Sequence, residues 1–264
     1  MVEEAYYRGK ENQMKRDELT AYLNDYLRVK EIGDRSQNGL QVEGPEEVAK
    51  VAFAVDSCQA VFEQAVAVGA QLLVVHHGLF WDEPVRLVGL LFRRVRALIE
   101  GGCGLYAVHL PLDLHPEVGN NAELVRLLGL KDARAFGEYH GIEIGIGGVL
   151  DAPLPLDALV ERLAQATGEP PVRVLAHGPE QVLRVGCISG DAVSLVDRVT
   201  EAGFDTFVTG ETRHPYFHSA ADYGLNIIYG GHYATETLGV KALAQHVAAE
   251  FGLEVTFLDL PTGM

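Results

Sequence analysis

The chain has 264 residues, of which 48% are hydrophobic and 22% are charged. This composition excludes an intrinsically disordered or collagen-like chain, and the length is sufficient for one large α/β domain or two smaller ones. Asp and Glu total 37 against 21 Lys and Arg, which gives a formal net charge of −16. Such an acidic chain argues against a surface that coats nucleic acid.

The three cysteines and the first residues bear on the cellular compartment. Cys58, Cys103 and Cys187 lie singly in apolar runs without a C-x-x-C pair, which predicts reduced thiols in a cytoplasmic protein rather than disulfides or a thiolate zinc site. Residues 1–13 are polar, lack the apolar core of a signal peptide, and are predicted to be a disordered extension. No apolar run approaches the roughly 18 residues of a membrane span, so no membrane partner is expected.

The first half of the chain alternates between strand and helix patterns. Apolar residues recur at helical spacing from Asp17, and glycines then predict a loop that ends at Gly44-Pro45. Beyond that loop, buried strands alternate with helices that pack against them, the pattern of a parallel sheet with helical crossovers. The predicted strands are 48–55, 71–75 and 104–108, and the predicted helices are 59–68 and 90–100.

The same order returns later, with residues 51–77 aligning with the second copy at an offset of 134. The repeat indicates an internal duplication, although any two crossover units share this pattern. The fold class predicted is α/β, with two related lobes of mostly parallel or mixed sheets flanked by helices. The first lobe comprises 14–126 plus 233–264 and the second 127–232. The later elements are strands 184–189, 206–209, 226–229 and 253–258, and helices 156–167, 194–202, 218–223 and 235–251.

Four histidines lie directly after apolar strands, where the carboxyl ends of parallel strands form the ligand-binding crevice. They are His76, His77, His109 and His232. Neighbouring residues in a regular strand face opposite sides, so His76 and His77 serve one site only if the strand ends there. Gly78 would permit that turn.

Two acids accompany the histidines. Asp113 follows His109 by four residues across Pro111, which predicts a loop, whereas His232 and Glu236 share one face of a predicted helix. Imidazole and carboxylate without thiolate suit Zn, Mn, Fe, Co or Ni. Five candidate ligands exceed the three that usually hold one catalytic zinc, so the sequence predicts two metal ions and a metal-activated water that performs hydrolysis.

Structural histidines and surface acids are the plain alternative. Glu211 falls at the repeat position of His77, yet an exposed loop acid is its default interpretation. The remaining histidines lack strand-end placement and are interpreted as surface or structural: His115, His140, His177, His214, His218 and His246. Phosphate-loop, Rossmann and serine-hydrolase motifs are missing from the sequence.

Four motifs resemble the signatures of the NIF-three-like family, also catalogued as GTP cyclohydrolase I type 2 homologues. They are NGLQVEG (38–44), VVHHGLFW (74–81), HLPLDLHPEVGNNAEL (109–124) and GGHYATE (230–236). The resemblance implies a toroidal homohexamer of two-lobed α/β subunits, in the short form without an inserted domain. It also implies a dinuclear metal centre in each subunit, with metal ligands His76, His77, Asp113, His232 and Glu236.

The resemblance gives His109 a place beside the ligands, and a catalytic role in moving a proton is our hypothesis for it. The predicted activity is a metal-dependent hydrolase that acts on a small, nucleotide-like substrate. A different class of function is a metal carrier or a ring-shaped interaction scaffold. Nucleic acid threading through the ring would need a basic lumen, which Arg93, Arg94 and Arg96 supply only if they face inward.

Overall fold

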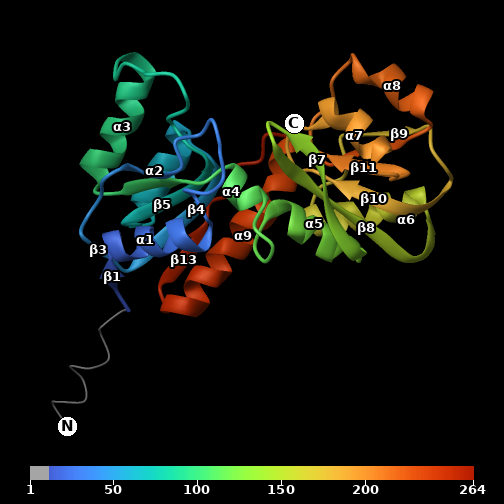
Figure 1. Ribbon diagram of the computed structural model, residues 1–264. Helices are drawn as coiled ribbons and strands as arrows, with labels where there is room; N and C mark the ends of the chain where they lie inside the picture. Colours follow the sequence, from blue (N-terminus) through green and yellow to red (C-terminus); the bar gives the residue numbers. More distant parts are fainter. Residues whose placement is uncertain (1–11) are drawn as a thin grey trace, which may run out of the picture. The chain divides into compact units, whose positions relative to one another are not determined.

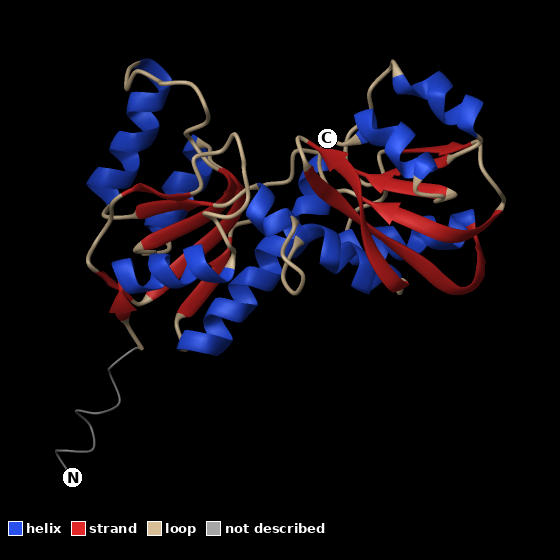
Figure 2. Cartoon of the chain, in the orientation of Figure 1, coloured by secondary structure: helices blue, strands red, loops and turns tan. Residues whose placement is uncertain are grey.

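The computed structural model describes residues 12–264, so the prediction for residues 1–11 lies outside the described residues. The chain divides into two compact units, each a β-sheet with helices on both faces (Figures 1 and 2). Unit 1 runs to Pro111 and also contains Val240–Leu260, whereas unit 2 contains Leu112–Gly239 and Pro261–Met264. The predicted α/β class with mixed sheets is confirmed. No helix among the described residues has the length and apolar character needed to cross a membrane.

Unit 1 is built on a five-stranded sheet of order β13-β4-β5-β6-β2. The first four strands run parallel, and β2 pairs antiparallel with β6 at one edge. A separate two-stranded ribbon joins β1 and β3. The strands are β1 (Met14–Lys15), β2 (Gly39–Val42), β3 (Glu47–Val48), β4 (Lys50–Asp56), β5 (Leu72–His77), β6 (Gly104–Ala107) and β13 (Glu254–Phe257).

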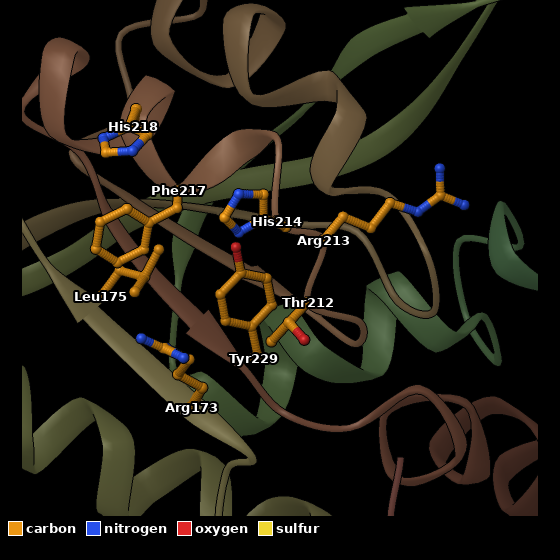
Figure 3. A pocket seen from close by; sticks show the side chains of 8 residues that line it. All are labelled: Arg173, Leu175, Thr212, Arg213, His214, Phe217, His218 and Tyr229. Carbon is orange, nitrogen blue, oxygen red and sulfur yellow. The ribbon is translucent and has the colours of Figure 1, made fainter.

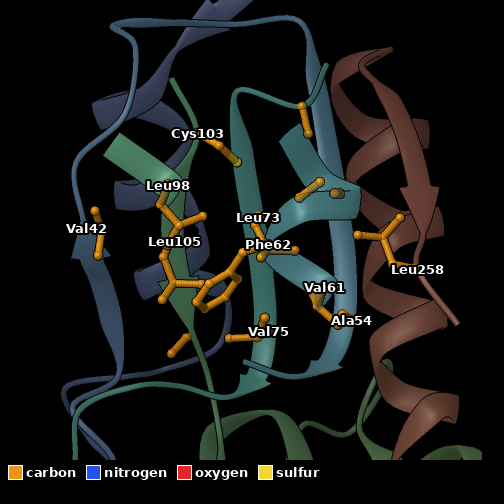
Figure 4. Close-up of a cluster of buried hydrophobic side chains, with 14 of the residues drawn as sticks. Val42, Ala54, Val61, Phe62, Leu73, Val75, Leu98, Cys103, Leu105 and Leu258 are labelled. Atoms are coloured by element: carbon orange, nitrogen blue, oxygen red, sulfur yellow. The ribbon is translucent and has the colours of Figure 1, made fainter. Parts of the chain in front are cut away.

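Helices cover both faces of this sheet, which explains why β4 and β5 are almost wholly apolar. On one face, Phe62 of α2 and Leu98 of α3 pack against Leu73 and Leu105 (Figure 4). On α1, Leu19 and other residues at helical spacing are buried, and the Tyr106 hydroxyl donates to Asn24 Oδ1 at 3.0 Å. The helices are α1 (Arg16–Tyr26), α2 (Gln59–Ala67) and α3 (Gly89–Gly101).

Unit 2 holds a mixed six-stranded sheet of order β7-β8-β10-β11-β12-β9. The three central strands are parallel, and antiparallel strands flank them. The strands are β7 (Lys131–Tyr139), β8 (Ile142–Pro155), β9 (Arg173–Ala176), β10 (Gln181–Cys187), β11 (Thr206–Thr209) and β12 (Asn226–Tyr229). The helices are α5 (Asn120–Leu128), α6 (Leu156–Thr167), the 3-10 turn η1 (Val193–Leu195), α7 (Val196–Glu201) and α8 (Tyr216–Tyr223).

The two sheets share a strand-helix-strand-helix-strand core with the same register in its first pair. Val51 of β4 is opposite Leu72 of β5, and Val185 of β10 is opposite Thr206 of β11. Both residues of one pair are 134 positions from their counterparts, which is the offset of the sequence repeat. This shared topology and register agree with an internal duplication.

One predicted element needs correction. The predicted loop before Gly44 contains strand β2, because an antiparallel edge strand needs only backbone partners on β6. The unit boundaries also differ from the predicted lobes: Leu124 and Leu128 of α5 pack into the core of unit 2, and so does Leu238. Two elements therefore contribute to both units, α4 (Leu110–Asp113) and α9 (His232–Phe251).

Candidate metal centre

Unit 1 brings together three of the predicted site residues at the carboxyl ends of β5 and β6. The ligand nitrogens of His76, His77 and His109 all lie within 4.8 Å of one another. His76 is fully buried, while the other two rings are partly exposed. We call these three residues the histidine triad.

The adjacent His76 and His77 belong to one cluster, but not because the strand ends before them, as the sequence predicted. Strand β5 does not stop before them but continues through His77, which pairs with Asp56 of β4. The ring centroids of His76 and His77 are nevertheless only 4.7 Å apart, at an interplanar angle of 50°. Both rings therefore serve one cluster although the strand has not ended.

Each ring of the triad places Nδ1 against an oxygen. His76 Nδ1 lies 3.0 Å from the Val108 carbonyl, and His77 Nδ1 lies 2.8 Å from Asp56 Oδ1. His109 Nδ1 lies 3.0 Å from Asp34 Oδ1. Because these oxygens accept, Nδ1 carries the proton in each neutral ring and Nε2 is the nitrogen suited to a metal.

Asp34 is held as a carboxylate by a network of donors. Its side chain is 3% exposed and also accepts from Asn38 Nδ2 and from the Leu110 amide, each at 2.9 Å. Burial on its own raises the pKa of Asp34, but the hydrogen bonds from His109 and Asn38 outweigh it and lower that pKa to about 2. The ionised Asp34 thus fixes the orientation of His109.

Unit 2 holds the other three predicted residues, beginning with a histidine between two acids. His232 is the first residue of α9, and its Nε2 lies 3.1 Å from Glu236 Oε1 one turn later. Its Nδ1 lies 2.6 Å from Glu211 Oε1. Burial lowers the pKa of His232, but the hydrogen bonds with Glu236 and Glu211 raise it to about 10. A cation that binds His232 at Nε2 would replace a proton there.

Gly190 forms a cradle for this pair. Its φ of +64° is a left-handed conformation, and a Cβ there would lie 2.2 Å from Glu236 Oε1 and 3.2 Å from His232 Nε2. The Gly190 carbonyl accepts from the amide of Glu211 at 3.0 Å, and its amide donates to Thr235 Oγ1 at 3.1 Å. The absence of a side chain at Gly190 therefore leaves room for the acid and the imidazole.

Asp113 is buried nearby in unit 2, beside the same loop. Its Oδ1 accepts from Asn120 Nδ2 at 2.8 Å and from Ser189 Oγ at 3.1 Å, and Ser189 directly precedes Gly190. The loop predicted at Asp113 is wrong, because Leu110–Asp113 forms the short helix α4. Pro111 is compatible with that helix because the first turn needs no donor from its amides.

Comparison with known proteins identifies the family of this chain. Residues 14–263 match the model of Duf34/NIF3 (NGG1p interacting factor 3). The chain belongs to the DUF34/NIF3 family. The family resemblance drawn from the four motifs is thereby confirmed.

Relatives and solved structures cover almost the full chain. A Deinococcus radiodurans protein named GTP cyclohydrolase 1 type 2 homolog is 43% identical over 251 residues, 94% of each chain. The crystal structure of TTHA1606 from Thermus thermophilus is 47% identical, with a TM-score of 0.86 over 95% of this chain and all of that one. The structure of protein ybgI, of unknown function, is 38% identical, with a TM-score of 0.89 over the same shares.

In this DUF34/NIF3 chain, sequence reasoning found the histidines but missed most of the groups that orient them. The sequence gives no signal for Asp34, because that residue lies in a loop far along the chain from His109. Asp56 ends strand β4, so the strand-end criterion applied to the histidines could have identified it. The interpretation of Glu211 as a loop acid misses the contact that its carboxylate makes with His232. His115, interpreted as structural, is buried and accepts from the Val118 amide at 3.2 Å.

Proposed function

We propose that this chain holds two divalent metal ions per subunit. One observation carries the proposal: in all four strand-end histidines, Nδ1 lies against a carboxylate or carbonyl oxygen. Metal-binding histidines characteristically engage their second nitrogen in this way, since that contact fixes the tautomer and the ring orientation. The residues that would hold the ions are His76, His77, Asp113, His232 and Glu236.

The donor set fits such ions. Imidazole nitrogens and carboxylate oxygens without a thiolate suit Zn, Mn, Fe, Co or Ni, and five side chains exceed the needs of one catalytic zinc. In the proposal, the histidines and the acids together supply the ligands of the two ions.

We further propose that the activity is hydrolysis of a small, nucleotide-like molecule. Two bound divalent ions would acidify a water molecule and neutralise charge that develops on the bond being broken. His109, aligned by the ionised Asp34, would move a proton at Nε2. The nucleotide-like substrate rests on the relatives' name, GTP cyclohydrolase 1 type 2 homolog.

Metal analysis tests the ligand assignment. Protein purified without added metal is measured by inductively coupled plasma mass spectrometry for wild type, Asp113→Ala and Glu236→Ala. His140→Asn is the matched control, because His140 is exposed and Asn tolerates its positive φ of 50°. We expect metal loss in the first two variants only. Unchanged metal content in both would refute the assignment.

Turnover separates the enzyme from a metal carrier or scaffold. Nucleotides and phosphoesters are screened with Mn, Zn, Fe or Ni restored, and active compounds are retested with His109→Gln. We expect this variant to retain metal and to lose at least a hundredfold in rate, the usual contribution of a positioned proton-transfer group. A protein that exchanges its ions readily and turns over no compound would favour the carrier.

Self-association into a toroidal homohexamer remains a further proposal. It is supported by large apolar side chains that stand exposed on and before α3: Val88 (65%), Ile99 (62%), Leu90 (50%) and Phe92 (49%). A cytoplasmic location also stays a prediction. The three cysteines support it, since none of them forms a disulfide.

A further inference from the structure

Unit 2 contains a second candidate binding site, distinct from the proposed metal ligands. A cavity of about 460 Å³ opens between β9, β12 and the segment that leads into α8 (Figure 3). This volume is in the range of small-molecule pockets. The lining residues are Arg173, Leu175, Thr212, Arg213, His214, Phe217, His218 and Tyr229.

The lining contrasts with the acidic chain around it. It includes two arginines and two histidines and no Asp or Glu, although the chain carries a net charge of −16. Such a local excess of cationic and donor groups attracts an anion. We call this cavity the Arg173 pocket.

The two arginines are not equivalent. Arg213 forms an ion pair with Asp191, and Figure 3 shows its side chain extending away from the other labelled groups. Arg173 is exposed and has no ion pair among the described residues. Its guanidinium lies 5.7 Å from the ring centroid of Phe217, and its N–H groups have no acidic partner among the described residues.

Tyr229 supplies an independent sign of a ligand. It is opposite Arg173 in the antiparallel β9-β12 pair, so both side chains stand on one face of the sheet. Tyr229 as a residue is only 2% exposed, and its hydroxyl points into the middle of the pocket beside His214 (Figure 3). No described group forms a hydrogen bond with this hydroxyl, so a ligand in the pocket can bond to it.

The chemistry of the lining defines the ligand. Arg173, Tyr229, His214 and Thr212 all line the pocket from different elements, and each carries a hydrogen-bond donor. Donors spread over several elements suit a tetrahedral oxyanion better than a flat carboxylate. Phe217 and Leu175 offer an apolar wall beside these donors. We propose that the Arg173 pocket binds a phosphate monoester attached to a planar ring, with the phosphate on Arg173 and Tyr229 and the ring against Phe217.

Titration calorimetry with adenosine 5′-monophosphate tests this proposal on the full-length protein. We expect binding that weakens at least tenfold in Arg173→Ala and several-fold in Tyr229→Phe, which removes only the hydroxyl. Arg213→Ala is the matched control, because Asp191 already engages that arginine, and its affinity should change less than twofold. Arg173→Lys, which keeps the charge without the planar fork, should fall between wild type and Arg173→Ala.

Three further measurements test whether the nucleotide binds at the Arg173 pocket rather than at the proposed metal centre, and whether both its phosphate and its ring contribute to binding. Glu236→Gln should bind adenosine 5′-monophosphate as wild type does. Loss of binding in Glu236→Gln together with retention in Arg173→Ala would place the nucleotide at the metal centre and overturn the proposal. Adenosine and inorganic phosphate should each bind more weakly than the whole nucleotide. Equal affinity for adenosine, or no binding of the nucleotide at millimolar concentration, would also overturn it.

Discussion

Glu211 Oε1 lies 2.6 Å from Nδ1 of His232, and this contact orients an imidazole that a neighbouring acid approaches from the other side. The pair joins the end of β11 to the start of α9. Asp34 and Asp56 have the same relationship to His109 and His77 in unit 1. Carboxylates behind histidines are therefore a repeated feature of the proposed metal centre.

Replacing Glu211 by Gln should weaken metal binding without removing a ligand. The variant keeps the shape of the side chain but loses the charge that aligns His232, and losses of this kind cost about 10- to 100-fold in metal affinity. Competition with a chromogenic chelator measures it. Glu161→Gln, an exposed acid on α6, should match wild type. Equal affinities for the Glu211 and Glu161 variants would contradict the role assigned to Glu211.

Replacing Gly190 by Ala should lower both stability and metal content. A Cβ at this position would be 2.2 Å from Glu236 Oε1, in a backbone with φ of +64°. Gly203→Ala is the matched control, because Gly203 has φ of +79° but a Cβ there would meet no other atom within 4 Å. Both variants should lose about 1 kcal/mol from backbone strain, measured by urea unfolding. Only Gly190→Ala should also lose metal.

The buried Asp34 should make stability depend on pH. Its folded pKa of about 2 lies below the ordinary value of 3.8, so its contribution is fully present above pH 4 and declines as pH falls toward 2. Asp34→Asn should therefore be less stable than wild type at pH 7, by about 2 kcal/mol. Urea unfolding at several pH values should show the two proteins converging below pH 4. A constant difference down to pH 2 would argue against the ionised carboxylate.

The cysteines should differ in reactivity. Burial raises the pKa of the Cys103 thiol to about 12 and also raises that of Cys187, whereas Cys58 is only partly buried. Ellman's reagent should therefore label Cys58 in the native protein and all three thiols after unfolding. Mass spectrometry of the labelled peptides identifies the site. Rapid labelling of Cys187 in native protein would contradict its burial.

The apolar side chains of α3 should matter for self-association. Phe92→Glu puts a charge among exposed apolar groups that the proposed homohexamer would bury, and an unpaired buried charge is costly. Light scattering should report a smaller mass for this variant than for wild type. Gln64→Glu, an exposed position on α2, should leave the mass unchanged. A wild type that is monomeric at all concentrations would rule out the homohexamer.

Much of the fold could be predicted because the central strands are buried on both faces. Residues 206–209 and 226–229 are strands as predicted, and 156–167 is the helix predicted, since apolar runs and helical periodicity are local signals. Strand β2 and helix α4 were missed for the opposite reason. Strand β2 pairs with β6 through backbone groups, and α4 is only one turn long, so neither element produces a clear pattern of side chains in the sequence.

The sequence by itself determined the α/β alternation and the placement of His76, His77, His109 and His232 after apolar strands. Only the tertiary structure decided which carboxylates stand behind them and that Arg173 faces Tyr229. Asp34 and His109 are 75 positions apart, so no local pattern relates them. Burial of apolar side chains drives the strands of each unit into a sheet, and that packing brings polar groups from distant parts of the chain together.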